Sequence, residues 1–173
     1  AYNYQQPQMN IARVAIGGLK HYENSFSYPI AVTLKNRGLS AISSASITVN
    51  CNGTISNIPC TGTLNSEDTI TVSLGNVTIN AGENRIIVIA NNPNGNPDDI
   101  IIDDTLSLVV FGCSGSLSGA YTIGATGDYV SINEAIDFIS ACGISGDVTF
   151  NLLPGTYDEV VLLRNNFNFN STF

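Results

Sequence analysis

Basic side chains are scarce in this sequence, and their scarcity excludes several classes of partner. Lysine and arginine together number 6, against 14 aspartates and glutamates, and the net charge is -8 at pH 7. Nucleic acids and anionic membrane surfaces are bound through clusters of lysine and arginine, so neither is an expected partner. No apolar run approaches the roughly 20 residues that cross a bilayer, so direct membrane insertion is not expected.

Histidine occurs once and tryptophan is absent. A Ser-His-Asp triad or a histidine-containing zinc site would depend on His21, whose neighbours form no such motif, so His21 is expected in an exposed loop. Without tryptophan, an aromatic platform for sugar binding would have to come from Tyr22, Tyr28, Tyr121 or Tyr129. The sequence therefore predicts no catalytic residue, and calcium is the one cofactor that it leaves open.

Charged residues make up only 12% of the chain. Asparagine, serine, threonine and glycine instead crowd the spaces between short runs of isoleucine and valine, which is typical of an extracellular β protein. The start at Ala1 shows no signal-peptide pattern. The strand-like pattern at the other end is unfinished, so we expect the natural polypeptide to continue beyond Phe173.

Four cysteines, Cys51, Cys60, Cys113 and Cys142, show no zinc-binding spacing. They allow three pairings. We favour Cys51 with Cys60, across a short loop containing glycine and proline, and Cys113 with Cys142, since each pair stays within one segment of the chain. The alternative is that they are free buried thiols of a cytosolic protein.

Short apolar runs separated by turn residues predict a β-sandwich over residues 11–111, after an N-terminal extension over 1–10. Seven runs are expected to form strands: 11–19, 28–36, 45–50, 54–58, 69–74, 85–90 and 105–111. In two of them apolar and polar residues alternate, as in half-buried strands. The continuous apolar run 86–89 instead predicts a central strand covered on both faces.

The character of the chain changes after residue 111. A Gly/Ser-rich stretch over 112–120 is expected to be a linker. Ser131 with Glu134 forms a capping box, and an apolar stripe follows until Gly143, so the sequence predicts a helix of about three turns. Ile132, Ala135, Ile136 and Ile139 form that stripe. Strands are expected on either side of the helix, with two after it, at 148–153 and 159–163.

One segment resembles a known family. The run GAYTIGATGDYVSINEAIDFISACGISGDVTFNLLPGTYDEVVLL, residues 119–163, is similar to the start of a right-handed parallel β-helix of the pectate-lyase-like superfamily, as found in large surface proteins of the Bacteroidetes. The resemblance implies that residues 121–173 are a capping helix and the first coils of a truncated β-helix. It also implies that Ile132, Ile136 and Ile139 face the coils. Catalytic groups of that family lie on later coils, so Asp158 and Glu159 are expected to close a coil by hydrogen bonds.

The sandwich segment resembles the CARDB-like, immunoglobulin-like and fibronectin-type-III-like adhesion modules, in "YPIAVTLKNRG", "AGENRIIVIANNPNGNPD" and "DDT". Such modules space or present an adhesive domain, which implies a stalk. Two Asp-Thr-apolar triplets resemble the general O-glycosylation sequence of secreted Bacteroidetes proteins and would place sugar on Thr69 and Thr105. The same resemblance implies export by type IX secretion and a place on the bacterial cell surface.

The richest supply of oxygen ligands follows the run 85–90. Calcium is bound by six to eight oxygens from carboxylates, amides and backbone carbonyls, and Asn94, Asn96, Asp98 and Asp99 could supply some of them. The spacing is not that of an EF-hand. A plain polar loop is the alternative interpretation.

Together these features predict a non-catalytic structural or adhesive segment of a long secreted bacterial surface or matrix protein. The expected partners are other copies, neighbouring surface proteins or extracellular polysaccharide. Two alternatives stay open. The chain could begin a polysaccharide lyase or glycoside hydrolase whose active site lies beyond residue 173, or it could be a carbohydrate-binding module.

Overall fold

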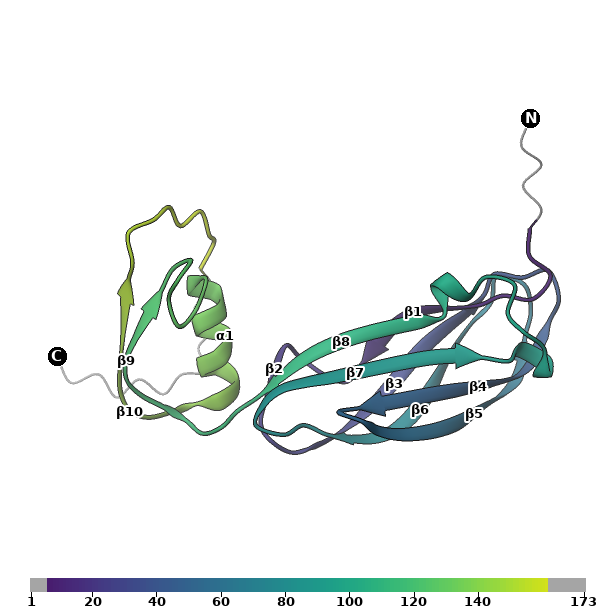
Figure 1. Cartoon of the computed structure of the whole chain (residues 1–173), viewed down its shortest axis with the longest axis horizontal. Helices are drawn as coiled ribbons and strands as arrows, with labels where there is room; N and C mark the ends of the chain where they lie inside the picture. The colour runs from purple at the N-terminus through teal and green to yellow at the C-terminus, as the bar shows by residue number, and fades with distance from the viewer. Residues whose placement is uncertain (1–5, 162–173) are drawn as a thin grey trace.

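The described chain consists mainly of β-strands. In the computed structural model, which describes residues 6–161, a β-sandwich and a smaller β-α-β unit lie end to end (Figure 1). The sandwich strands are β1 (Ile11–Gly17), β2 (Tyr22–Glu23), β3 (Ser27–Asn36), β4 (Ile42–Cys51), β5 (Thr54–Leu64), β6 (Thr69–Thr78), β7 (Gly82–Asn91) and β8 (Thr105–Gly112). The short 3₁₀ turns η1 (Pro93–Gly95) and η2 (Ile101–Asp103) lie between β7 and β8, and the β-α-β unit comprises β9 (Leu117–Ile123), α1 (Ile132–Cys142) and β10 (Ile144–Leu152).

The sandwich consists of two sheets, with strand orders β1-β3-β6 and β2-β8-β7-β4-β5. All strand pairs within it are antiparallel except β2 with β8. Each of the seven predicted runs coincides with one of the strands β1 and β3 to β8, so the predicted β-sandwich is confirmed. Strand β2 was not predicted, because two residues are too few to show an alternating pattern.

The alternating strands bury one face each. Ile30, Val32 and Leu34 of β3 are 2%, 0% and 0% exposed and pack in the core of the sandwich, as their spacing predicts. Strand β7 lies between β4 and β8, so the prediction of a central strand is confirmed. The prediction that both of its faces are covered is wrong: Ile87 and Ile89 are half-exposed, because the outer face of this sheet is turned to solvent.

Helix α1 begins and ends where the sequence predicts. The Ser131 hydroxyl accepts a hydrogen bond from the Glu134 backbone at 3.0 Å, and Gly143 follows the last helical residue. One predicted core residue is wrong. Ile136 is half-exposed, whereas Phe138 packs into the unit's core. The buried stripe is centred on Ala135, and at 3.6 residues per turn Ile136 lies about 100° around the helix from it.

The predicted linker over 112–120 is too long. Gly112 ends β8 and Leu117 begins β9, so only residues 113–116 connect the sandwich to the β-α-β unit. Residues 117–120 are strand because β9 pairs in parallel with β10, whose Val148 lies opposite Gly119. The Gly/Ser composition does not indicate this strand, because the strand is formed by backbone pairing with β10.

The two ends of the described chain also differ from expectation. Of the predicted extension 1–10, residues 1–5 lie outside the described residues, whereas residues 7–10 pack on the sandwich. The carbonyls of Pro7 and Gln8 accept hydrogen bonds from the backbone of Leu39 and Ser40. The predicted strand 159–163 has no strand at 159–161, and residues 162 and 163 lie outside the described part.

Candidate functional site

The sandwich and the β-α-β unit meet at a junction formed by Tyr22, Phe111, Cys113, Phe138 and Cys142. Tyr22, in β2, is 6% exposed. Its ring centroid lies 5.8 Å from that of Phe111 in β8 and 5.3 Å from that of Phe138 in α1. Aromatic side chains at these separations pack favourably. The rings therefore form a continuous apolar contact from the sandwich to the helix.

The hydroxyl of Tyr22 completes this contact. It donates a hydrogen bond to Glu134 Oε1 at 2.7 Å, and Glu134 Oε2 accepts one from the Val130 backbone at 2.7 Å. Burial and the hydrogen bond to this carboxylate raise the pKa of Tyr22. No local pattern in the sequence indicates the contact, because Tyr22 and Glu134 are 112 positions apart.

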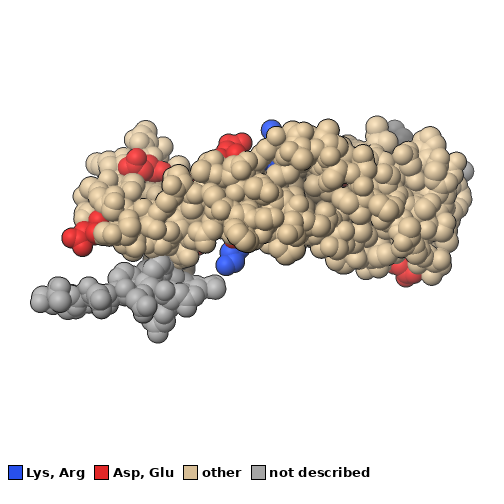
Figure 2. Space-filling model, turned by 90° about the horizontal axis from the view of Figure 1, so that it is seen from below, with Lys and Arg blue, Asp and Glu red and all other residues tan. Residues whose placement is uncertain are grey.

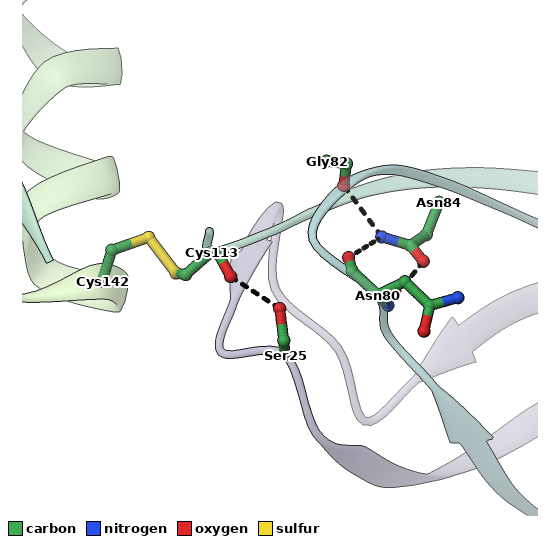
Figure 3. Close-up of a disulfide and its surroundings, with 6 residues drawn as sticks. All are labelled: Ser25, Asn80, Gly82, Asn84, Cys113 and Cys142. Atoms are coloured by element: carbon green, nitrogen blue, oxygen red, sulfur yellow. Dashed lines mark hydrogen bonds between the residues drawn. A yellow bond between two sulfur atoms is a disulfide. The ribbon is translucent and has the colours of Figure 1, made fainter. Parts of the chain in front are cut away.

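A disulfide crosses the junction (Figure 3). It joins Cys113, directly after β8, to Cys142 at the end of α1, with 5.4 Å between their Cα atoms. This predicted pairing is confirmed. The Ser25 hydroxyl donates a hydrogen bond to the Cys113 carbonyl at 2.6 Å, which holds the loop after β2 against the same residue.

The neighbouring turn between β6 and β7 is organised by Asn84, whose side chain is 0% exposed. Its amide nitrogen donates to the carbonyls of Asn80 and Gly82 at 2.7 and 2.9 Å, and its oxygen accepts from the Asn80 backbone at 2.8 Å (Figure 3). The Asn52 side chain donates to the same oxygen at 2.7 Å. Every polar atom of this buried amide is thus paired.

The second predicted disulfide, Cys51 with Cys60, is wrong. Both cysteines are free and buried. They lie on paired strands, but the register places Cys51 opposite Thr54 and Cys60 opposite Ala45. The two Cα atoms are consequently about 20 Å apart along the sheet, whereas a disulfide needs Cα atoms within about 7 Å. Burial raises the pKa of both thiols, and they serve as core side chains.

Of the two predicted coil-closing residues, Asp158 and Glu159, Glu159 makes hydrogen bonds inside the β-α-β unit. Glu159 Oε1 and Oε2 accept from the backbones of Ile132 and Asn133, both at 3.0 Å, at the start of α1. These bonds lower the pKa of Glu159, and they satisfy donors that have no partner within the helix. The Tyr157 hydroxyl lies 2.8 Å from the Ile123 carbonyl and 2.7 Å from the Leu153 carbonyl. Asp158 is exposed.

The oxygens of the predicted calcium loop are largely engaged within the protein. Asn94 Oδ1 accepts from the Ser43 backbone at 2.7 Å. Asp98 accepts from the backbones of Ile11 and Ile100, and Asp99 Oδ2 from those of Gln8 and Met9 at 2.9 Å. Asn96 is exposed, and its side-chain nitrogen donates to the Asn94 carbonyl at 3.2 Å. Calcium binding at these four residues stays a prediction.

The other predicted sites are surface positions or core positions. Thr69 and Thr105, at the starts of β6 and β8, are exposed, and their glycosylation stays a prediction. His21 is exposed. Tyr22 and Tyr129 are 6% and 7% exposed, which leaves neither ring free to act as a sugar-binding platform. Burial raises the pKa of Tyr129 to about 12.

Charged groups are sparse on the surface. On the face seen in Figure 2, acidic and basic side chains are few and scattered among uncharged atoms. Within residues 6–161, no three His, Cys, Asp or Glu side chains form a group that could hold a metal ion. The helix present in that range is too short and too polar to cross a bilayer.

Comparisons with known proteins support the sandwich. No family model matches the chain, and no curated protein matches it significantly. The crystal structure of the CARDB domain of the PF1109 protein from Pyrococcus furiosus, in complex with di-metal ions, superposes with a TM-score of 0.51 at 18% identity, covering 65% of this chain and 98% of that domain. A solution NMR structure of the same domain gives 0.49 at 18% identity, covering 64% and 98%.

At 18% identity the crystal structure of that domain shows the fold alone. It does not transfer the metal ions of the archaeal domain to this chain. The sandwich is therefore a CARDB-like β-sandwich, as the sequence resemblance implies.

Proposed function

We propose that this chain is a non-catalytic structural segment of a long exported bacterial surface or matrix protein, in which a CARDB-like sandwich is rigidly joined to the start of the next unit. The observation that carries this proposal is the junction. A disulfide, a buried tyrosine and a hydrogen bond to Glu134 act together where the sequence alone predicted a linker.

A rigid connection suits a spacer better than it suits an independent binding domain. Domains joined by Gly/Ser linkers move freely. Here the connecting segment, residues 113–116, is short, and the contacts between the sandwich and the β-α-β unit are buried or covalent. A stalk must keep its length and direction, and coupling the end of β8 to α1 provides both.

We further propose that the β-α-β unit is the capped start of a right-handed parallel β-helix. Three features support it: the parallel pairing of β9 with β10, the helix connecting them, and Glu159 capping that helix. Leu152 and Val160 are 56% and 80% exposed. Exposed apolar side chains of this kind are what a following coil would cover.

The proposed location is the outside of a bacterial cell, reached by type IX secretion in a member of the Bacteroidetes. The confirmed disulfide supports an oxidising compartment. Exposed Thr69 and Thr105 are accessible to O-glycosylation.

Other copies, neighbouring surface proteins or extracellular polysaccharide are the proposed partners. An enzyme whose active site lies in later coils is the alternative, and longer sequence with clustered Asp, Arg and Lys would favour it. The carbohydrate-binding alternative lacks exposed platforms at Tyr22 and Tyr129.

The rigid-spacer proposal can be tested by ¹⁵N relaxation in solution. We expect the sandwich and the β-α-β unit of the wild-type chain to tumble with one rotational correlation time. A variant with Tyr22→Ala, Cys113→Ser and Cys142→Ser should show two shorter correlation times. Phe26→Ala is the matched control, since this exposed ring of the neighbouring loop packs on Tyr28 and not on α1. Independent tumbling of the wild-type units would refute the spacer.

A further inference from the structure

Three buried side-chain oxygens near the start of β8 have no hydrogen-bond partner. They are Oδ1 of Asn10, Asp103 and Asp104. Asn10 is 2% exposed and Asp104 5%. Asn10 Nδ2 lies 3.4 Å from Asp103 Oδ2, so the amide and that carboxylate are neighbours. Buried polar atoms without partners are rare, and an ion or water is a usual explanation.

Other buried amides of this chain show that the missing partners are specific to one place. Asn36 and Asn84 are both 0% exposed. Asn36 donates to the carbonyls of Ser40 and Leu64 and accepts from the Gly38 backbone, each at 2.9 Å. The buried side-chain amides of Asn36 and Asn84 thus have hydrogen-bond partners for their oxygen and nitrogen atoms, whereas the side-chain oxygen of Asn10 has none.

The surroundings of the three oxygens are acidic. Burial, followed by the charges of Asp98 and Asp103, raises the pKa of Asp104 to about 7, and Arg13 partly opposes this shift. Arg37 Nη1 lies 3.8 Å from Asp103 Oδ2 and leaves Oδ1 of that carboxylate free. Both oxygens of Asp98 already accept backbone hydrogen bonds. Asp98 thus contributes charge, whereas Asn10, Asp103 and Asp104 contribute unpaired oxygens.

We propose that Asn10, Asp103 and Asp104 bind a divalent cation, calcium, with backbone carbonyls and water as the remaining ligands. The donors are hard oxygens of the kind that calcium prefers. The site uses two carboxylates and one amide, so it is compatible with the absence of a group of three His, Cys, Asp or Glu ligands from the described residues. It also differs from the loop predicted from sequence, where Asp98 and Asp99 are engaged by backbone N–H groups.

The position of the site gives the ion a structural role. Asn10 directly precedes β1, in the three-stranded sheet, and Asp104 directly precedes β8, in the five-stranded sheet. An ion held between them would cross-link the two sheets at the end of the sandwich that lies away from the β-α-β unit (Figure 1). Cation binding would therefore stabilise the sandwich rather than the β-α-β unit.

The test is calorimetric titration of the EDTA-treated full chain with calcium chloride at pH 6 and pH 8. We expect one site at pH 8 and about tenfold weaker binding at pH 6, because Asp104 must lose its proton to bind the ion. The charged groups that face Asp104 are Asp98, Asp103 and Arg13, and Arg37 lies against Asp103. Calcium should also raise the melting temperature of the sandwich.

Two variants separate the possible outcomes. Asp104→Asn, which keeps the shape of the side chain, should abolish binding at both pH values while circular dichroism shows a native fold. Asp99→Asn, in the sequence-predicted loop, should bind like the wild type. Absence of heat and of a melting shift at both pH values would overturn the proposal in favour of a buried water or a proton on Asp104. Binding that is lost in Asp99→Asn and kept in Asp104→Asn would place calcium in the loop instead.

Discussion

The two ends of the sandwich differ in whether their buried polar groups have hydrogen-bond partners. At the junction, Asn84 pairs all of its polar atoms, and the Tyr22 hydroxyl binds Glu134 at 2.7 Å. At the other end, Asn10 and Asp104 are just as deeply buried, yet each keeps an oxygen without a partner. Burying an unpaired polar group costs free energy. The junction end is therefore arranged for stability, whereas the acidic end is the place where we propose that an ion binds.

The largest expected effect comes from titrating the acidic end. The folded-state pKa of Asp104, about 7, is above its ordinary value of 3.8, so the native state binds more protons than the unfolded state between these values. In EDTA, the free energy of unfolding should therefore fall as the pH rises from about 4 to about 7, by at most about 4 kcal/mol at about 1.4 kcal/mol per pKa unit.

Urea denaturation at pH 4.5, 6 and 8 measures this dependence. Asp104→Asn should remove the fall and be more stable than the wild type at pH 8. Asp147→Asn, at an exposed position of β10, is the control that should leave it unchanged. A wild-type stability that rises from pH 4.5 to pH 8 in EDTA would contradict the assignment of the unpaired charge to this end.

Breaking the junction should have the next largest effect. Closing a loop of 29 residues restricts the unfolded chain, so replacing Cys113 and Cys142 by serine should destabilise the β-α-β unit by about 3.6 kcal/mol. Differential scanning calorimetry should then show two transitions, with the sandwich transition unchanged. Wild-type protein reduced with dithiothreitol should behave like the double variant, because Cys51 and Cys60 are already free. One unchanged transition in both samples would show that the disulfide contributes little.

Substituting the buried asparagine at each end of the sandwich should destabilise the protein by different amounts. Asn84→Ala removes several hydrogen bonds and leaves buried backbone groups unpaired, so it should cost about 2 to 3 kcal/mol. Asn10→Ala removes one long contact together with an unpaired oxygen, and in EDTA it should cost less than about 1 kcal/mol. Urea denaturation of both variants at one pH measures the two losses in free energy of unfolding. Equal losses would mean that the two ends do not differ.

The sequence predicted those parts of the fold that depend on local patterns. The seven long sandwich strands follow from apolar alternation, and α1 follows from Ser131 and Gly143. Features that depend on distant pairing were missed. Strand β2 exists because it pairs with β8, and residues 117–120, which were predicted as linker, belong to β9 because β10 lies beside them.

The candidate sites divide in the same way. The pairing of Cys113 with Cys142 was predicted because both fall within one segment, whereas the pairing of Cys51 with Cys60 failed because strand register, which composition does not reveal, separates them. The contacts of Asn10 with Asp103 and of Tyr22 with Glu134 join residues 93 and 112 positions apart. No spacing rule reaches that far, so only the folded structure shows them.

The smallest effect is expected inside the β-α-β unit, where Glu159 caps α1. Glu159→Gln keeps the side-chain length and one acceptor oxygen but removes the negative charge at the positive end of the helix dipole. The melting temperature of the unit should fall slightly. Because these bonds lower the pKa of Glu159, their contribution is present above the ordinary pKa of the carboxyl and is lost as the pH falls through the lowered value. Wild type and variant should therefore differ at pH 7 and converge in acid, as thermal scans followed by circular dichroism would show. A difference that persists unchanged at pH 2 would mean that the variant disturbs packing, and that Glu159 closes the unit by shape and not by charge.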